Sequence, residues 1–230
     1  MQGLKPLPMT TAVSPLRNSV PVKLRLISLI AITLLPACAR ETLQQGGVWT
    51  RRSACPITGI AAGTGDVTTF NPAGSTDSAA IDVSAAMTNL RSSCDETGDQ
   101  IVSTVSFDVV GIRRDPGPAR QVVLPYFDVV VQAGNQVVAK RVGYIALNFA
   151  DGAIQARTAG QATARVHRGA ATLPRDVQQT LTRERRPGDP QAAIDPLSDP
   201  AVRAAVAKAT FEHIVGFNLT QDQLRYNVTR

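Results

Sequence analysis

The sequence predicts a mainly β protein, an antiparallel immunoglobulin-like β-sandwich with one or two short C-terminal helices. Apolar and polar residues alternate with a period of two in several short segments between Ile81 and Leu219, as in half-buried strands. Short stretches rich in Gly, Asp and Asn separate these segments and are typical of turns. Six or seven such strands, with the early cysteine pair Cys55 and Cys94, indicate a sandwich.

The first two predicted strands flank a polar turn. Residues 81–88 alternate with a period of two, and residues 101–112 place Val105 and Phe107 on the same face. The polar segment 94–99 between them suits a loop joining neighbouring antiparallel strands.

The strongest pattern predicts a hairpin. The segment 113–118 contains two prolines, which lack the donor that a sheet needs, so a loop is expected there. The runs Val122–Gln132 and Gln136–Phe149 are rich in β-branched and aromatic residues and flank Gly134-Asn135, a turn signal. We expect Phe127, Val129 and Val131 to share one face of the first arm, and Ile145, Leu147 and Phe149 one face of the second.

A weaker strand is expected next. Asp151-Gly152 is a second hairpin signal and leads into the polar, alanine-rich segment 153–167, which we interpret as an edge strand or one with a solvated outer face. Residues 175–186 predict a short helix, and the proline-rich stretch near 183–200 predicts a surface excursion.

The C-terminal part predicts a helix, a strand and a final turn. Ser198 or Asp199 is expected to cap a helix that has Pro200 at its first position. The segment 211–219 alternates with His213 on its apolar face, and Thr220 can cap a last helical turn.

The N-terminal segment has the layout of a secretory signal. Basic Lys23 and Arg25 precede the apolar run 26–35, which is too short to span a bilayer stably and ends at Leu35-Pro-Ala-Cys38. This order resembles the signal of bacterial lipoproteins. The resemblance implies a signal peptide over 1–37, acylation of Cys38, and Cys38 as the first residue of a mature, lipid-anchored chain.

The same resemblance suggests the organisation of the mature chain. We expect the lipidated Cys38 to begin a Gly/Gln-rich flexible tether over 38–52, followed by the sandwich domain over 53–230. By similarity, Ala39 after the cysteine implies the outer membrane, with the domain facing the periplasm.

Three further segments resemble small envelope lipoproteins of alphaproteobacteria. They are Leu124-Pro-Tyr-Phe127, the hairpin 134–140 and the ending 214–227. This resemblance implies a localisation and a fold, and it implies no activity.

Charge gives no argument for an electrostatic partner. Removing the first 37 of the 230 residues leaves 193, and it removes four of the 24 basic residues and none of the 18 acidic ones. The mature net charge is then about +2, too balanced to indicate nucleic acid as a partner.

The cysteine count fits this arrangement. Assigning one of three cysteines to lipid leaves Cys55 and Cys94, which are expected to join in an oxidising compartment. Two buried free thiols or a metal site are the alternatives, and two cysteines with no nearby histidine supply few metal ligands.

No catalytic pattern stands out. His213 among apolar strand positions is typical of a core or interface residue, and His167 at the end of a polar strand is typical of a surface residue. Asp95, Glu96 and Asp99 share a turn that either is solvated or holds calcium. We predict no catalytic residues, no metal site and no cofactor.

The sequence therefore favours a lipid-anchored envelope protein with a structural or protein-interaction role, contacting the membrane through its lipid and an envelope protein through its domain. The sheet edges and the excursion near 183–200 are the expected docking surfaces. A periplasmic module that binds a small ligand or ion between the sheets is the alternative, and a hydrolase with an unrecognised site is a third hypothesis.

Overall fold

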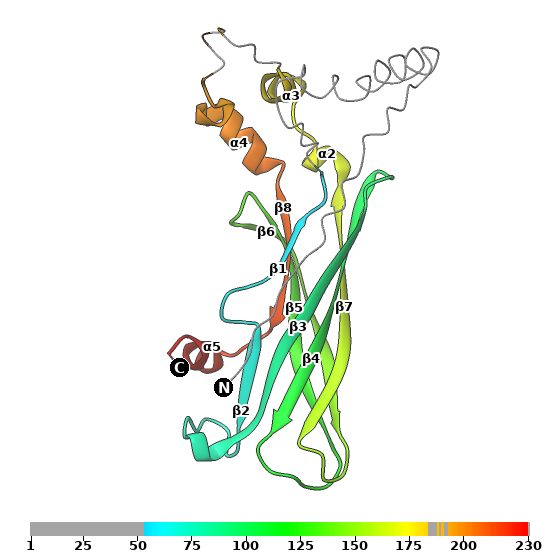
Figure 1. The fold of residues 1–230 in the computed structure, drawn as a ribbon, viewed down its shortest axis with the longest axis vertical. Coiled ribbons are helices and arrows are strands. Elements are labelled where there is room, and N and C mark those ends of the chain that lie inside the picture. The colour runs from blue at the N-terminus through cyan, green and yellow to red at the C-terminus, as the bar shows by residue number, and fades with distance from the viewer. Residues whose placement is uncertain (1–52, 184–187, 189, 191–192, 230) are drawn as a thin grey trace, which may run out of the picture. The chain divides into compact units, whose positions relative to one another are not determined.

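Two four-stranded β-sheets make up most of the described structure. The computed structural model describes residues 53–183, 188, 190 and 193–229. Sheet A has the strand order β1-β8-β5-β6 and sheet B the order β2-β3-β4-β7. The described residues belong to one compact unit, in which the two sheets face each other (Figure 1).

The first two strands and the last are short, and the five between them are long. They are β1 (Ile57–Ile60), β2 (Asp66–Phe70), β3 (Ile81–Asp95), β4 (Gln100–Arg113), β5 (Arg120–Gln132), β6 (Gln136–Phe149), β7 (Gln155–His167) and β8 (Phe211–Phe217). The helices are α2 (Arg168–Ala171), α3 (Arg175–Thr182), α4 (Pro200–Lys208) and α5 (Gln221–Thr229), with 3-10 turns at Ser78–Ala80 and Pro196–Ser198. No helix in the described ranges is long and apolar enough to cross a bilayer.

Antiparallel pairing dominates both sheets. Strands β2, β3, β4 and β7 are antiparallel to their neighbours in sheet B, and β5 is antiparallel to both β6 and β8 in sheet A. The first strand, β1, pairs with β8 in parallel, with Ile57 opposite Glu212 and Gly59 opposite Ile214. These registers decide which side chains point between the sheets and which point outward.

The main core lies between the sheets. Strands contribute alternate side chains to it, because successive residues of a strand point to opposite faces. Its fully buried members include Val105 and Phe107 of β4, Leu147 and Phe149 of β6, and Val215 and Phe217 of β8. Burial of each large side chain stabilises the fold by about 1.5–3 kcal/mol.

Two glycines make room for aromatic rings in this core. A Cβ on Gly160 would lie 2.5 Å from a ring carbon of Phe107, and one on Gly143 would lie 2.6 Å from Cζ of Tyr126. The two rings meet edge to face with centroids 5.4 Å apart. The small residues of β6 and β7 therefore set how closely the aromatic side chains of β4 and β5 can pack.

Helices close the ends of the sandwich. A small cluster containing Val177 of α3 and Val202 of α4 packs near the start of β8. Asp199 caps α4 by accepting a hydrogen bond from the Ala201 amide at 2.7 Å. Thr220 and Gln223 cap α5 reciprocally, as the sequence predicts.

Most predicted elements are confirmed. Strands β3 and β4 flank the turn before Gln100, and the hairpin of β5 and β6 turns at Ala133-Gly134-Asn135. Strand β7 is an edge strand of sheet B, and β8 presents His213 to the interior.

Two interpretations were wrong. The Gly- and Thr-rich segment before Asn71 contains strands β1 and β2, which were not expected because Gly59, Gly63 and Gly65 interrupt the pattern. The link at Asp151-Gly152 turns the chain as expected, but β6 belongs to sheet A and β7 to sheet B, so the two strands do not form a hydrogen-bonded hairpin. The expected signal peptide (1–37), Cys38 and the tether (38–52) lie outside the described residues.

One covalent link joins the two sheets. The sulfur atoms of Cys55, just before β1, and Cys94, near the end of β3, lie 2.03 Å apart, the pairing that the sequence predicts. Glu96 reinforces this end by accepting a hydrogen bond from the Ala54 amide at 3.2 Å. The link fixes the start of sheet A against the end of the longest strand of sheet B.

Replacing Cys55 and Cys94 together with serine is expected to lower the free energy of unfolding by up to about 4 kcal/mol, because the unfolded chain is no longer cross-linked. Denaturant unfolding under oxidising conditions measures this change. Reductant should destabilise the native chain and leave the double variant unchanged. Equal unfolding midpoints of the two proteins without reductant would contradict the link.

Candidate interaction surface

The side of sheet A that points away from sheet B is unusually apolar. The registers place Phe127, Val129 and Val131 of β5 on this side, opposite Val142, Lys140 and Val137 of β6 respectively. We define the sheet A outer face by the outward residues Ile57, Ala61, Val123, Pro125, Phe127, Val129, Val131, Val137, Lys140, Val142, Tyr144, Glu212 and Ile214.

Many of these side chains are exposed. The exposed fraction is 73% for Tyr144, 62% for Ile57, 60% for Val137 and 52% for Val123. Single exposed apolar residues are ordinary, but a contiguous set of this kind marks an interaction site in soluble domains. The sheet A outer face is therefore the strongest candidate for binding in the described part of the chain.

A shallow hollow lies at one end of this face. Its volume is about 440 Å³, and its lining is mostly apolar, with Lys140 and Glu212 as the charged members. The lysine ammonium lies 5.4 Å from the centre of the Phe127 ring, a favourable cation–π position. The hollow thus combines apolar side chains on β5 with one positive and one negative group.

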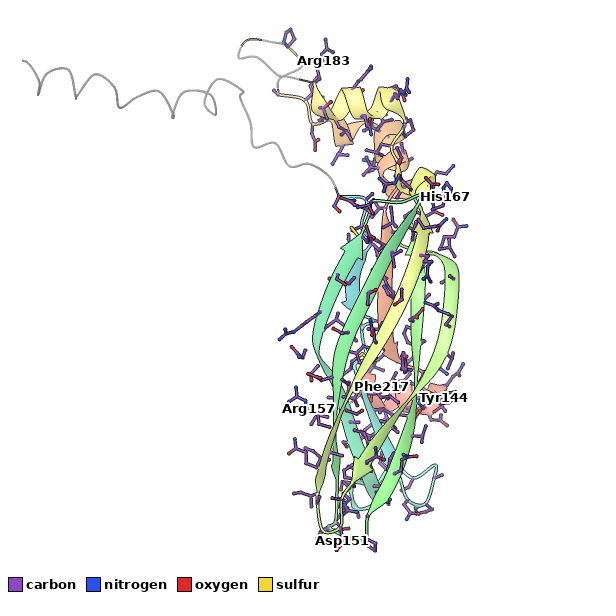
Figure 2. All side chains as sticks on the ribbon, turned by 90° about the vertical axis from the view of Figure 1, so that its right-hand side faces the viewer. Tyr144, Asp151, Arg157, His167, Arg183 and Phe217 are labelled. Atoms are coloured by element: carbon purple, nitrogen blue, oxygen red, sulfur yellow. A yellow bond between two sulfur atoms is a disulfide. The ribbon has the colours of Figure 1, made fainter. Side chains whose placement is uncertain are left out.

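The outer face of sheet B is different. Thr104 and Thr163 contact each other through their hydroxyl groups, and Arg157 donates to the Asp108 carboxylate at 2.6 Å. Hydrogen bonds from Arg157 and then Asn89 hold the pKa of Asp108 below its usual range. Figure 2 shows Tyr144 and Arg157 on opposite sides of the molecule, so the apolar outer face of sheet A and the polar outer face of sheet B point away from each other.

A polar cluster lies inside the sandwich. The Ser103 hydroxyl on β4 and Nδ1 of His213 on β8 are 3.0 Å apart, and both side chains are almost completely buried. Asp128 on β5 lies near the histidine and accepts hydrogen bonds from Arg141, at 2.9 Å for the closer oxygen. The arginine also donates to the carbonyl of Thr163 on β7, so it bridges the two sheets.

The electrostatics of this cluster favour a neutral histidine. Burial lowers the pKa of His213, and the positive charge of Arg141 lowers it further, while Asp128 acts in the opposite direction. Its Nε2 atom is buried without a hydrogen-bond partner among the described residues. The pair resembles the serine and histidine of hydrolases in chemistry only, because exposed fractions of 1% and 0% leave no approach for a substrate.

A second cleft lies at the opposite end of the sandwich and is built around Arg113. The cleft has a volume of about 420 Å³ and is also lined by Arg114, Arg120 and Asp82. The buried Arg113 guanidinium donates to the carbonyls of Gly117, Pro118, Ala150 and Ala153. These bonds occupy most of its donors and clamp two loops together, which is a structural role.

The remaining predicted candidates lie at the surface. His167 caps α2 by accepting a hydrogen bond from the Gly169 amide through Nδ1, at 3.1 Å. Asp95 accepts from both the amide and the hydroxyl of Thr97, which lowers its pKa. The described residues contain no group of three or more His, Cys, Asp or Glu side chains placed to hold a metal ion.

No family model, curated protein sequence or solved structure matches this chain. The surfaces just described are therefore the basis of the function proposed below.

Sequence reasoning did not identify the sheet A outer face, although a signal was present. The run Val122–Val131 is apolar at both even and odd positions, which is typical of a strand covered on both sides. The partners of His213 were also missed. Asp128 looks like an outward residue between Phe127 and Val129, and nothing in the sequence marks Ser103, which shares the face of Val105, as the partner of a distant histidine.

The stability of the fold should depend on pH through His213. Since its folded-state pKa lies below the ordinary value of 6.5, the unfolded chain takes up the proton first, and stability is expected to fall as the pH drops below about 6.5. Unfolding midpoints between pH 8 and pH 5 measure this loss. His213→Gln should reduce the pH dependence, and His167→Gln should keep it; equal slopes for native and His213→Gln proteins would contradict the assignment.

Proposed function

We propose that this chain is a lipid-anchored protein of the cell envelope whose β-sandwich domain has a structural role, binding another protein through the sheet A outer face. The observation that carries the proposal is the contrast between this apolar face and the polar outer face of sheet B. Water contact of a large apolar surface is unfavourable, by about 25 cal/mol per Å², and a bound partner removes it.

The composition of the face supports binding to protein. Aromatic side chains carry much of the energy of protein interfaces, and Phe127 and Tyr144 lie among valines on this face. The face is also part of a regular sheet held by long hydrogen-bonded strands, so little conformational entropy is lost when it binds.

The sequence and the cysteine pair support the location. The resemblance of residues 23–38 to a lipoprotein signal implies export and a lipid on Cys38. The pairing of Cys55 with Cys94 is of the kind found in proteins of the oxidising compartment beyond the inner membrane. By similarity, Ala39 makes the outer membrane the proposed site of the anchor.

A small-ligand module is the second candidate, and the hollow beside Lys140 favours it. Ligand pockets usually have volumes of 300–1,000 Å³ and apolar walls with a few polar groups, which describes this hollow. Its position on an open sheet face, instead of between the sheets, makes it a better fit to a protein side chain.

The immunoglobulin-like topology belongs to the same proposal. The sandwich architecture and the parallel pairing of the first strand with the last support it. The order of sheet B counts against it, because β2, β3 and β4 follow one another in the chain and also lie side by side in the sheet. In the immunoglobulin sheet with the order ABED, no three consecutive strands lie side by side.

Photo-crosslinking in intact cells tests the proposed surface. A photoreactive residue at Val142 or Val123 on the sheet A outer face is expected to form a discrete protein adduct. The matched control is Ile112, which is 54% exposed on the outer face of sheet B and should form none. Equal labelling from the two faces, or no adduct from sheet A positions, would overturn the proposal.

The anchor is tested in the same cells. Labelled palmitate should enter the native chain and be absent from Cys38→Ser, which should also leave the membrane fraction. Incorporation that persists in the variant would contradict acylation at this cysteine.

A further inference from the structure

We propose that the sheet A outer face is the interface of a homodimer, so that the partner protein is a second copy of this chain. The inference rests on the proposed function, because it names the occupant of the same surface. Two features carry it: the placement of the two charges on the face, and the orientation that their pairing imposes on two tethered copies.

The two charges lie on an apolar surface, where Lys140 contacts the Phe127 ring. Lys140 on β6 stands opposite Val129, and Glu212 on β8 stands opposite both Val131 and Ile57. No ion pair joins either residue to another described side chain. A partner that covered the face with apolar groups alone would bury both charges uncompensated, at a large cost in free energy.

A two-fold related copy supplies the missing charges. In such an interface the same patch meets itself, so a contact between Lys140 and Glu212 of the second copy occurs twice. One strand, β5, separates the two residues, which places them about 10 Å apart across the strands and about 7 Å apart along them. An axis lying in the interface above β5, between Val129 and Val131, exchanges the two positions.

This axis has a definite direction. From the spacings above it is inclined by about 35° to the strands of sheet A. The two copies are therefore related by an axis closer to the strand direction than to its perpendicular. Their Ser53 residues emerge at the same end of the dimer, as two chains anchored in one membrane require.

The size of the face indicates a weak interface. The outward residues from Val123 to Val131 span about 27 Å, and four strands span about 15 Å, so the face covers about 400 Å² in projection. Stable complexes bury about 800 Å² on each partner. The dimer thus gains from tethering, because two anchors in one membrane raise the effective concentration of each domain for the other.

Charge reversal tests the pairing. The full chain carrying Cys38→Ser is expected to form a reversible dimer in sedimentation equilibrium. Lys140→Glu and Glu212→Lys should each raise the dissociation constant at least about tenfold, because each removes both charge pairs. The combined variant should restore it to within about threefold, and a monomer at millimolar concentration, or no restoration, would overturn the inference.

Crosslinking in membranes provides a test that needs no change of charge. A cysteine introduced by Val131→Cys lies next to the axis and should link two copies, whereas Ile112→Cys on sheet B should not. A linked product of twice the monomer mass is expected. Adducts from the sheet A outer face to a different protein would overturn the homodimer and leave the proposed function standing, and loss of all adducts would overturn both.

Discussion

The strands of sheet A are apolar on both sides, and this constraint shapes the rest of the molecule. The inner side of β5, β6 and β8 meets sheet B and forms the core around Leu147 and Phe217. One sheet can cover only one side, so the other stays exposed, with Tyr144 at 73%. The outer face of sheet B is polar by contrast, and Asp108 and Arg157 form an ion pair on it. The exposed apolar side is thus a specific property of sheet A.

The connections between the sheets keep that surface rigid. The bond between Cys55 and Cys94, the contact of Ser103 with His213, and the bridge made by Arg141 each join an element of one sheet to the other. They gather near one end of the sandwich, since Cys94 lies directly opposite Ser103 and Thr163 directly opposite Thr104, and apolar packing joins the sheets over the rest of their length. A face fixed in this way is preorganised, which reduces the entropy lost when it binds.

The sequence predicts the regular part of the fold and misses what depends on contacts between distant segments. Alternation identifies β3, β4 and β8 because the pleat gives a period of two, and a high content of β-branched and aromatic residues around a turn signal identifies β5 and β6. Strand β1 was missed because its pairing with β8 stabilises a short, glycine-containing segment with no pattern of its own. The candidate surface was missed for a related reason. The run Val122–Val131 shows that both sides of β5 are apolar, but only the fold decides which side sheet B covers.

The most direct test of the account measures whether the sheet A outer face is covered where the protein works. Tyr144 is exposed on this face, while the Tyr126 ring packs against Phe107 in the interior. Chemical modification of tyrosines followed by peptide mass analysis compares purified monomer with intact envelopes. The account predicts that Tyr144 reacts readily in the monomer and is protected several-fold in the envelope, with Tyr126 slow in both. Equal reactivity of Tyr144 in the two states would contradict the central claim.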